Sequence, residues 1–138
     1  MLVFAGTGEV LNLASRHLVA KAKALNMPAL ALTDHGNMFG SLNFEKLCHV
    51  NGINPIVGCE FYVAYGSRFE HNTVPYSHKG EDGEGKAKYF HLVLLCENQT
   101  GYKNMSWLCS LGYTEGMYYK PRIDWELLEK YHEGLICC

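Results

Sequence analysis

Residues 29–37 read ALALTDHGN, and this stretch decides the fold expected for the rest of the chain. Its first five residues form a short apolar run, which is typical of a strand buried on both faces of a parallel sheet. Asp34, His35, Gly36 and Asn37 follow as a polar turn. A buried strand that ends in polar, ligand-type side chains predicts an α/β sheet with a site at its strand ends.

Helical patterns flank this strand on both sides. Apolar residues at helical spacing predict one helix over 11–25 and another over 39–50, which ends at Asn51-Gly52. Further strands are expected at 55–64, 89–96 and 135–138, and further helices at 101–111 and at 125–131 with Asp124 as N-cap. Strands that alternate with helices in this way predict a parallel α/β sheet or barrel.

The stretch 65–88 interrupts that alternation. Residues 80–86 read GEDGEGK, so we expect this stretch to be a flexible surface loop. The chain ends on the apolar strand 135–138, and an open parallel edge is unusual at the end of a whole domain. We therefore expect residues 1–138 to form one incomplete domain.

Composition narrows the class of protein. With 48% apolar and 19% charged residues, the chain has the composition of a globular protein. A net charge of −2 gives no overall attraction to nucleic acid, so a DNA role would need a local patch or another domain. Neither a signal peptide nor a membrane span is predicted. The six cysteines lack Cys-x-x-Cys spacing, which favours buried free thiols and a cytoplasmic location.

Three of the predicted strands carry side chains that commonly bind metals. Asp34 and His35 follow the first strand, Glu60 lies in the second and His91 in the third. Because the ends of parallel strands converge on one side of a sheet, these residues could build an open metal site. A metal cluster of this kind would lower the pKa of a bound water and hold a phosphate ester.

The same residues also have structural explanations, which the sequence leaves open. A histidine in an apolar strand is often a hydrogen-bonded core residue, Glu60 could pair with a lysine, and Asp34 could cap the turn before the next helix. Residues 118–122 read YYKPR and mix aromatic and cationic side chains, as single-strand binders do. We favour a packed aromatic pair with two solvated charges for that segment.

Longer phrases of the sequence resemble one known family. Residues 27–40 read MPALALTDHGNMFG and residues 52–63 read GINPIVGCEFYV, and similar phrases follow at 91–95, 98–104, 118–124 and 133–136. Together they resemble the PHP domain (polymerase and histidinol phosphatase domain) that opens bacterial DNA polymerase III alpha subunits, which are C-family replicative polymerases. The resemblance runs from about residue 18 to the end of the chain.

That resemblance implies a fold and a metal site. The fold would be an irregular (β/α)7 barrel, of which this chain holds the first several units. His35, Glu60 and His91 would bind a divalent metal, zinc or manganese, and Asp34 would support them. A PHP domain of this kind would either hydrolyse phosphate esters, as a 3′–5′ exonuclease does, or act as an inactive support.

The resemblance also implies a parent enzyme. That parent would carry out template-directed DNA synthesis as a nucleotidyltransferase with magnesium, in contact with DNA, its other polymerase domains and further replisome subunits. The catalytic carboxylates of polymerisation are not expected in this chain.

The first residues depart from the family pattern. The family opens with a strand that bears a His-x-His pair, whereas residues 1–10 read MLVFAGTGEV and no histidine precedes His17. Residues 1–17 are therefore divergent, and we expect this chain on its own to bind metal weakly or not at all. A stand-alone metal-dependent PHP phosphoesterase and a non-catalytic support domain are the alternatives.

Overall fold

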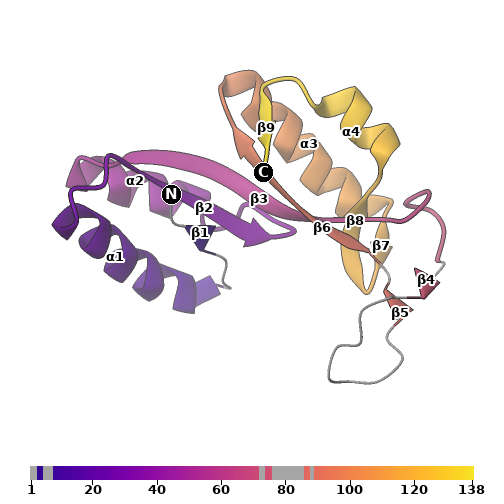
Figure 1. Cartoon of the computed structure of the whole chain (residues 1–138), viewed down its shortest axis with the longest axis horizontal. Coiled ribbons are helices and arrows are strands. Elements are labelled where there is room, and N and C mark those ends of the chain that lie inside the picture. Colours follow the sequence, from indigo (N-terminus) through magenta and orange to yellow (C-terminus); the bar gives the residue numbers. More distant parts are fainter. Residues whose placement is uncertain (1–2, 5–7, 72–73, 76–85, 88) are drawn as a thin grey trace.

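The computed structural model describes the chain except for residues 1–2, 5–7, 72–73, 76–85 and 88 (Figure 1). The helices are α1 (Gly8–Ala24), α2 (Ser41–Asn51), α3 (Gln99–Thr114) and α4 (Trp125–Tyr131). The strands are β1 (Val3–Phe4), β2 (Ala29–His35), β3 (Asn54–Val63), β4 (Val74–Pro75), β5 (Lys86–Ala87), β6 (Phe90–Cys96), β7 (Met117–Tyr118), β8 (Lys120–Ile123) and β9 (Leu135–Cys137).

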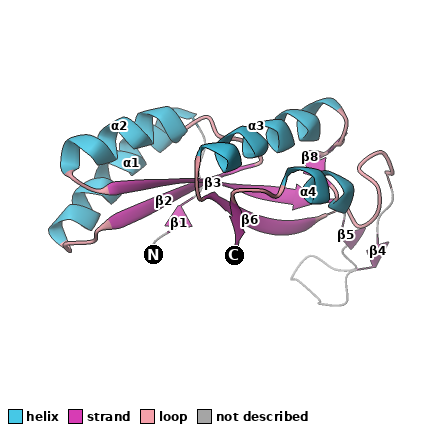
Figure 2. Cartoon of the chain, turned by 90° about the horizontal axis from the view of Figure 1, so that it is seen from above, coloured by secondary structure: helices cyan, strands magenta, loops and turns pink. Residues whose placement is uncertain are grey.

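The main sheet has the strand order β1-β2-β3-β6-β9. β1, β2 and β3 are parallel to one another. Where β2 ends, β8 takes its place beside the last residues of β3, also in parallel, and forms a hairpin with β7. α1, α2 and α3 lie on one side of the strands (Figure 2). The structure is therefore an α/β layer with one face of the sheet turned away from these helices.

The direction of β6 corrects the expectation of a parallel sheet. β6 is antiparallel to β3, and β9 is antiparallel to β6. A parallel return needs a crossover connection, usually a helix. Between β3 and β6 the described residues contain no helix, but the short strands β4 and β5 paired with each other. The chain therefore folds back beside β3, and the sheet is mixed.

Local signals explain where several helices begin and end. Gly52 has φ 71°, and its N–H bonds back to the carbonyls of Cys48 and His49, so it ends α2 as predicted. The Asn98 side chain accepts from the Gly101 N–H at the start of α3. Asp124 Oδ1 accepts from the Leu127 N–H at 3.1 Å, which confirms the predicted N-cap of α4.

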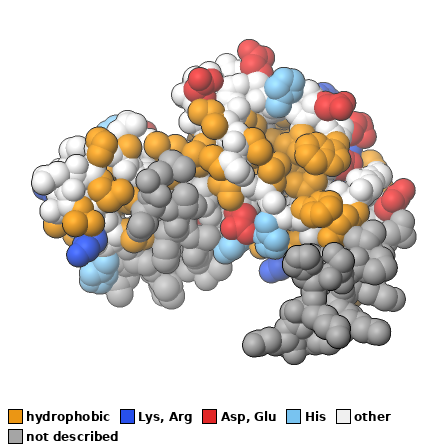
Figure 3. Space-filling model, in the orientation of Figure 1, with side chains coloured by type: hydrophobic (Ala, Val, Ile, Leu, Met, Phe, Trp, Pro, Cys, Tyr) orange, Lys and Arg blue, Asp and Glu red, His pale blue; other side chains and the backbone are white. Residues whose placement is uncertain are grey.

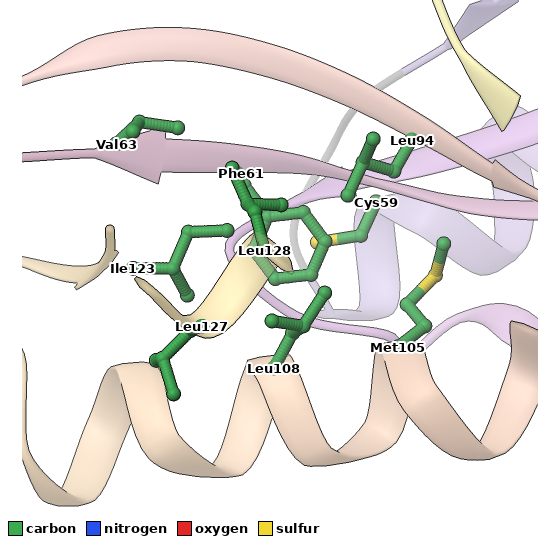
Figure 4. Packing of buried hydrophobic residues seen from close by; sticks show 9 residues of the cluster. All are labelled: Cys59, Phe61, Val63, Leu94, Met105, Leu108, Ile123, Leu127 and Leu128. Carbon is green, nitrogen blue, oxygen red and sulfur yellow. The ribbon is translucent and has the colours of Figure 1, made fainter. Parts of the chain in front are cut away.

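Two hydrophobic clusters lie beneath the helices. The first joins α1 and α2 to β2 through buried side chains such as Val19, Leu30 and Phe44. The second lies between β3, β6, β8, α3 and α4, and Figure 4 shows Phe61 and Leu108 among its members. Each fully buried side chain of this size contributes about 1.5–3 kcal/mol. β3 spans both halves of the molecule and connects the two clusters.

Part of the surface is hydrophobic, and the cysteines form no disulfide. Hydrophobic side chains gather in Figure 3 where Figure 1 shows β9 and α3, and Ile136 in the edge strand β9 is half exposed. In the described part of the chain, no helix has the length and apolar character needed to cross a membrane. All six cysteines are free, as predicted, although Cys137 and Cys138 are exposed and not buried.

Candidate functional site

His35, Glu60 and His91 form what we call the strand-end cluster. His35 is the last residue of β2 and lies directly opposite Glu60 of β3 in the parallel register. His91 is the second residue of β6 and lies opposite Tyr62, two residues beyond Glu60. Neighbours at these register positions project from the same face of a sheet. The structure therefore places all three side chains on one face.

The three side chains meet at a single carboxylate oxygen. Glu60 Oε1 is 2.6 Å from Nδ1 of His91 and 3.2 Å from Nδ1 of His35. The Glu60 side chain is 19% exposed, whereas those of His35 and His91 are 44% and 58% exposed. The cluster is thus open to solvent, and acidic and histidine side chains meet near the middle of the view in Figure 3. Glu60 pairs here with histidines and not with a lysine.

The cluster contains suitable donor atoms but is drawn together more tightly than a loaded metal site. A separation of 2.6 Å between nitrogen and oxygen is a hydrogen-bond distance. Ligand atoms about 2.0–2.2 Å from a tetrahedral ion must lie farther apart than this. Consistently, the described residues contain no group of three histidine, cysteine or acidic side chains that is spaced to hold a metal ion as it stands. A metal ion would have to separate the His91 and Glu60 side chains.

Asp34 precedes His35 and projects from the opposite face of β2. Its Oδ2 accepts from the Gly40 N–H at 2.9 Å, so Asp34 holds the turn before α2, as one of the sequence alternatives proposed. Its Oδ1 is buried without a hydrogen-bond partner among the described residues, and so is the Thr33 hydroxyl. Burial raises the pKa of the Asp34 carboxyl, although the Gly40 amide and the charge of His35 oppose that shift.

A second polar group, the arginine network, was not predicted from the sequence. Its members are Arg68, Arg122, Glu115 and Asp124. The Arg68 guanidinium bonds to both Asp124 oxygens at 3.0 and 3.1 Å and to Glu115 at 2.7 Å. Burial lowers the pKa of Arg68, but its bonds to Glu115 and Asp124 outweigh that effect and raise it. This arrangement fixes the segment after β3 against the start of α4.

Arg122 in the same network corrects the interpretation of residues 118–122. Tyr118 and Tyr119 pack edge to face at 4.7 Å, and Lys120 is exposed, as predicted. Arg122 is not solvated, however, because only 1% of it is exposed. Its guanidinium donates to the carbonyls of Arg68, Glu70 and Gly116. These acceptors are backbone atoms, and no sequence pattern predicts which carbonyls a buried arginine will contact.

Two hollows lie elsewhere on the molecule. One of about 400 Å³ is lined by residues of α2, β3 and the start of α3, including Leu42 and Tyr102. The other, of about 480 Å³, lies between Phe39 and the α3 side chains near Tyr113. Neither of these two hollows is lined by His35, Glu60 or His91.

Comparison with known proteins identifies what this chain is similar to. The family model described as the PHP domain matches residues 13–138. The DNA polymerase III subunit alpha of Treponema pallidum is 52% identical over 122 residues, which are 88% of this chain and 10% of that protein. The proteins of the same name from Chlamydia pneumoniae and Borreliella burgdorferi are each 50% identical, over 88% and 87% of this chain. The matched regions are 9% and 10% of those proteins, so the chain spans about a tenth of each relative's length.

Proposed function

Because the chain belongs to the PHP domain family, we propose that it is a portion of the PHP domain of a DNA polymerase III alpha subunit. Its identity of about 50% to proteins of that name over nearly nine-tenths of its residues supports this proposal. The whole protein would then synthesise DNA on a template with magnesium, in contact with DNA and other replisome subunits. The polymerase carboxylates would lie in its other domains, and its location would be the cytoplasm.

The proposal extends to the fold and to a metal site. An open sheet with helices on one side and a cluster of ligand-type side chains on the other is compatible with a segment of an irregular (β/α)7 barrel. The observation that carries the metal proposal is the approach of His35 and His91 to one oxygen of Glu60. Two imidazole nitrogens and a carboxylate suit zinc or manganese.

The chain's own residues would have distinct tasks at this site. His35 and His91 would each present Nδ1 to the ion, and Glu60 would present Oε1. Asp34 would hold the turn that follows His35 through its bond to Gly40. A bound divalent ion would supply an acidified water and an electrophile for a phosphate ester. Three open donors that must first separate from one another hold an ion weakly, so we expect weak binding by this chain.

Metal titration of purified chains tests the proposal. Isothermal titration with Mn²⁺ and Zn²⁺ would compare the unaltered chain with His35→Ala, Glu60→Gln and His91→Ala. His49→Ala is the matched control, because His49 is an exposed histidine that pairs with Glu45 on α2. We expect weak binding that each cluster substitution removes and that His49→Ala preserves.

Two outcomes would contradict this account. Equal binding by the cluster variants and His49→Ala would exclude the cluster as the metal site. Tight stoichiometric binding that His35→Ala and Glu60→Gln abolish would show that the chain holds a stronger site than its three donors predict.

A further inference from the structure

The β7–β8 hairpin lies beside the strand-end cluster. β2 ends at His35, and β8 continues along the same edge of β3, with Arg122 opposite Tyr62. A Cβ atom built on Gly36 would lie 2.9 Å from Pro121 and 3.1 Å from the Tyr62 ring. The turn after His35 is therefore in close contact with the hairpin. Lys120 lies two residues before Arg122, so its side chain projects from the face that carries Tyr62 and Glu60.

Aromatic rings connect this lysine to the cluster. The Lys120 ammonium lies 5.6 Å from the centre of the Tyr62 ring. Tyr62 meets His91 at 5.4 Å and Tyr89 at 4.8 Å, and Tyr89 meets His91 at 5.5 Å, each with the rings edge to face. His91 in turn contacts Glu60. A cation and three rings thus form a series of contacts that ends, through His91, at the Glu60 carboxylate.

The tip of the hairpin is held in a fixed conformation. Tyr119 has φ 60°, a left-handed conformation that an aromatic residue adopts only where its surroundings impose it. Arg122 supplies part of that constraint through its bonds to the carbonyls of Arg68, Glu70 and Gly116. Gly116 has no room for a side chain, because a Cβ would lie 1.8 Å from the Arg122 carbonyl oxygen. Lys120 is therefore presented from a rigid support.

Lys120 differs from the buried Arg68 in how its positive charge is paired. Arg68 pairs with Asp124 and Glu115, whereas no carboxylate of the described residues forms an ion pair with Lys120. A lysine without a carboxylate can neutralise a phosphate, and an adjacent aromatic face can stack on a base. Proteins that bind single-stranded DNA combine these two elements.

We propose that Lys120, Tyr89 and His91 form a binding subsite for single-stranded DNA beside the strand-end cluster. Lys120 contacts a backbone phosphate, and the rings of Tyr89 and His91 contact the base next to it. This proposal rests on the proposed function, because that function supplies the phosphoester site next to the subsite. It adds single-stranded DNA as the substrate class of that site. Binding itself requires no metal, so it can be measured separately.

The test measures binding of a fluorescent oligothymidylate of about eight nucleotides, a length within the usual site size of single-strand binders. Fluorescence anisotropy in EDTA would compare the unaltered chain with Lys120→Gln, Tyr89→Leu and Lys103→Gln. Lys103 is the matched control, because it is an exposed lysine on α3. We expect Lys120→Gln to raise Kd about fivefold and to lower the slope of log K against log salt by about one, with no change for Lys103→Gln.

Tyr89→Leu separates stacking from simple charge attraction. We expect it to weaken binding of oligothymidylate and to leave binding of an abasic oligonucleotide unchanged. Equal affinities for Lys120→Gln and Lys103→Gln, or no binding by the unaltered chain, would overturn the proposal. Thermal unfolding followed by circular dichroism must give matching midpoints for the variants compared. If Mn²⁺ binding fails while Lys120 still controls oligonucleotide affinity, the metal proposal falls and this one stands.

Discussion

The strand-end cluster and the arginine network are both groups of charged and polar side chains, but they differ in exposure and in how completely they are paired. In the network, the side chains of Arg68 and Asp124 are 8% and 4% exposed, and each Asp124 oxygen accepts from protein donors. In the cluster, both histidines are about half exposed and converge on one oxygen of Glu60. Buried charges must be paired within the protein, whereas exposed donors can exchange their partners for a ligand. The first group therefore supports the fold, and the second is available for binding.

The largest expected effect is at Asp124, which caps α4 and pairs with Arg68. Asp124→Ala should lower the free energy of unfolding by about 3–5 kcal/mol, because it leaves a buried guanidinium without its main partner. Asp124→Asn should lower the free energy of unfolding by less than Asp124→Ala does, since the asparagine keeps an acceptor for the helix cap. Urea unfolding followed by circular dichroism measures both.

Glu126→Ala is the control for this prediction. Glu126 also contacts Arg68, but its side chain is 77% exposed. Its replacement should change the free energy of unfolding by less than about 0.5 kcal/mol. If Asp124→Ala had an equally small effect, the buried network would not be the support that we describe.

A smaller effect is expected for Asp34→Asn, which should raise the stability of the fold and not lower it. Burial raises the pKa of its carboxyl in the folded state, so the folded chain holds the proton to higher pH than the unfolded chain does. Stability is then lost as the pH rises above about 3.9, the ordinary value for Asp. Asp34→Asn removes the buried charge and keeps an acceptor for the Gly40 N–H.

We therefore expect Asp34→Asn to raise the urea midpoint at pH 7 and to raise it less at pH 4. Glu45→Gln on the surface of α2 is the control, because Glu45 is half exposed. A lower midpoint for Asp34→Asn at pH 7 would show that the ionised carboxylate is stabilised by a partner.

The parts of the fold that follow from local signals were predictable from the sequence. The apolar run of β2, the glycine that ends α2 and the Asp124 cap of α4 all act within a few residues of themselves. The direction of β6 depends instead on how the chain crosses from β3, and residues 65–88 gave no helical pattern for a parallel crossover. The absence of a helical pattern in residues 65–88 was therefore the sequence signal that could have predicted an antiparallel β6.

The candidate site was predicted in part for the wrong reason. His35 ends β2 and lies opposite Glu60 within β3, so these two residues meet on neighbouring parallel strands, as expected. His91 joins them because β6 is antiparallel, so the start of β6 lies beside the end of β3. The burial of Arg122 could not be predicted, because its acceptors are carbonyls of residues 54, 52 and 6 positions away in the sequence.

The most direct test of the account is whether His35 and His91 share one ion. Two-dimensional NMR of the histidine rings would follow their signals as Mn²⁺ is added, with the exposed His49 and His132 as internal references. We expect the His35 and His91 signals to broaden together, at the same low Mn²⁺ concentration, while the reference signals persist. Broadening of only one of the two, or of neither before the references, would contradict it.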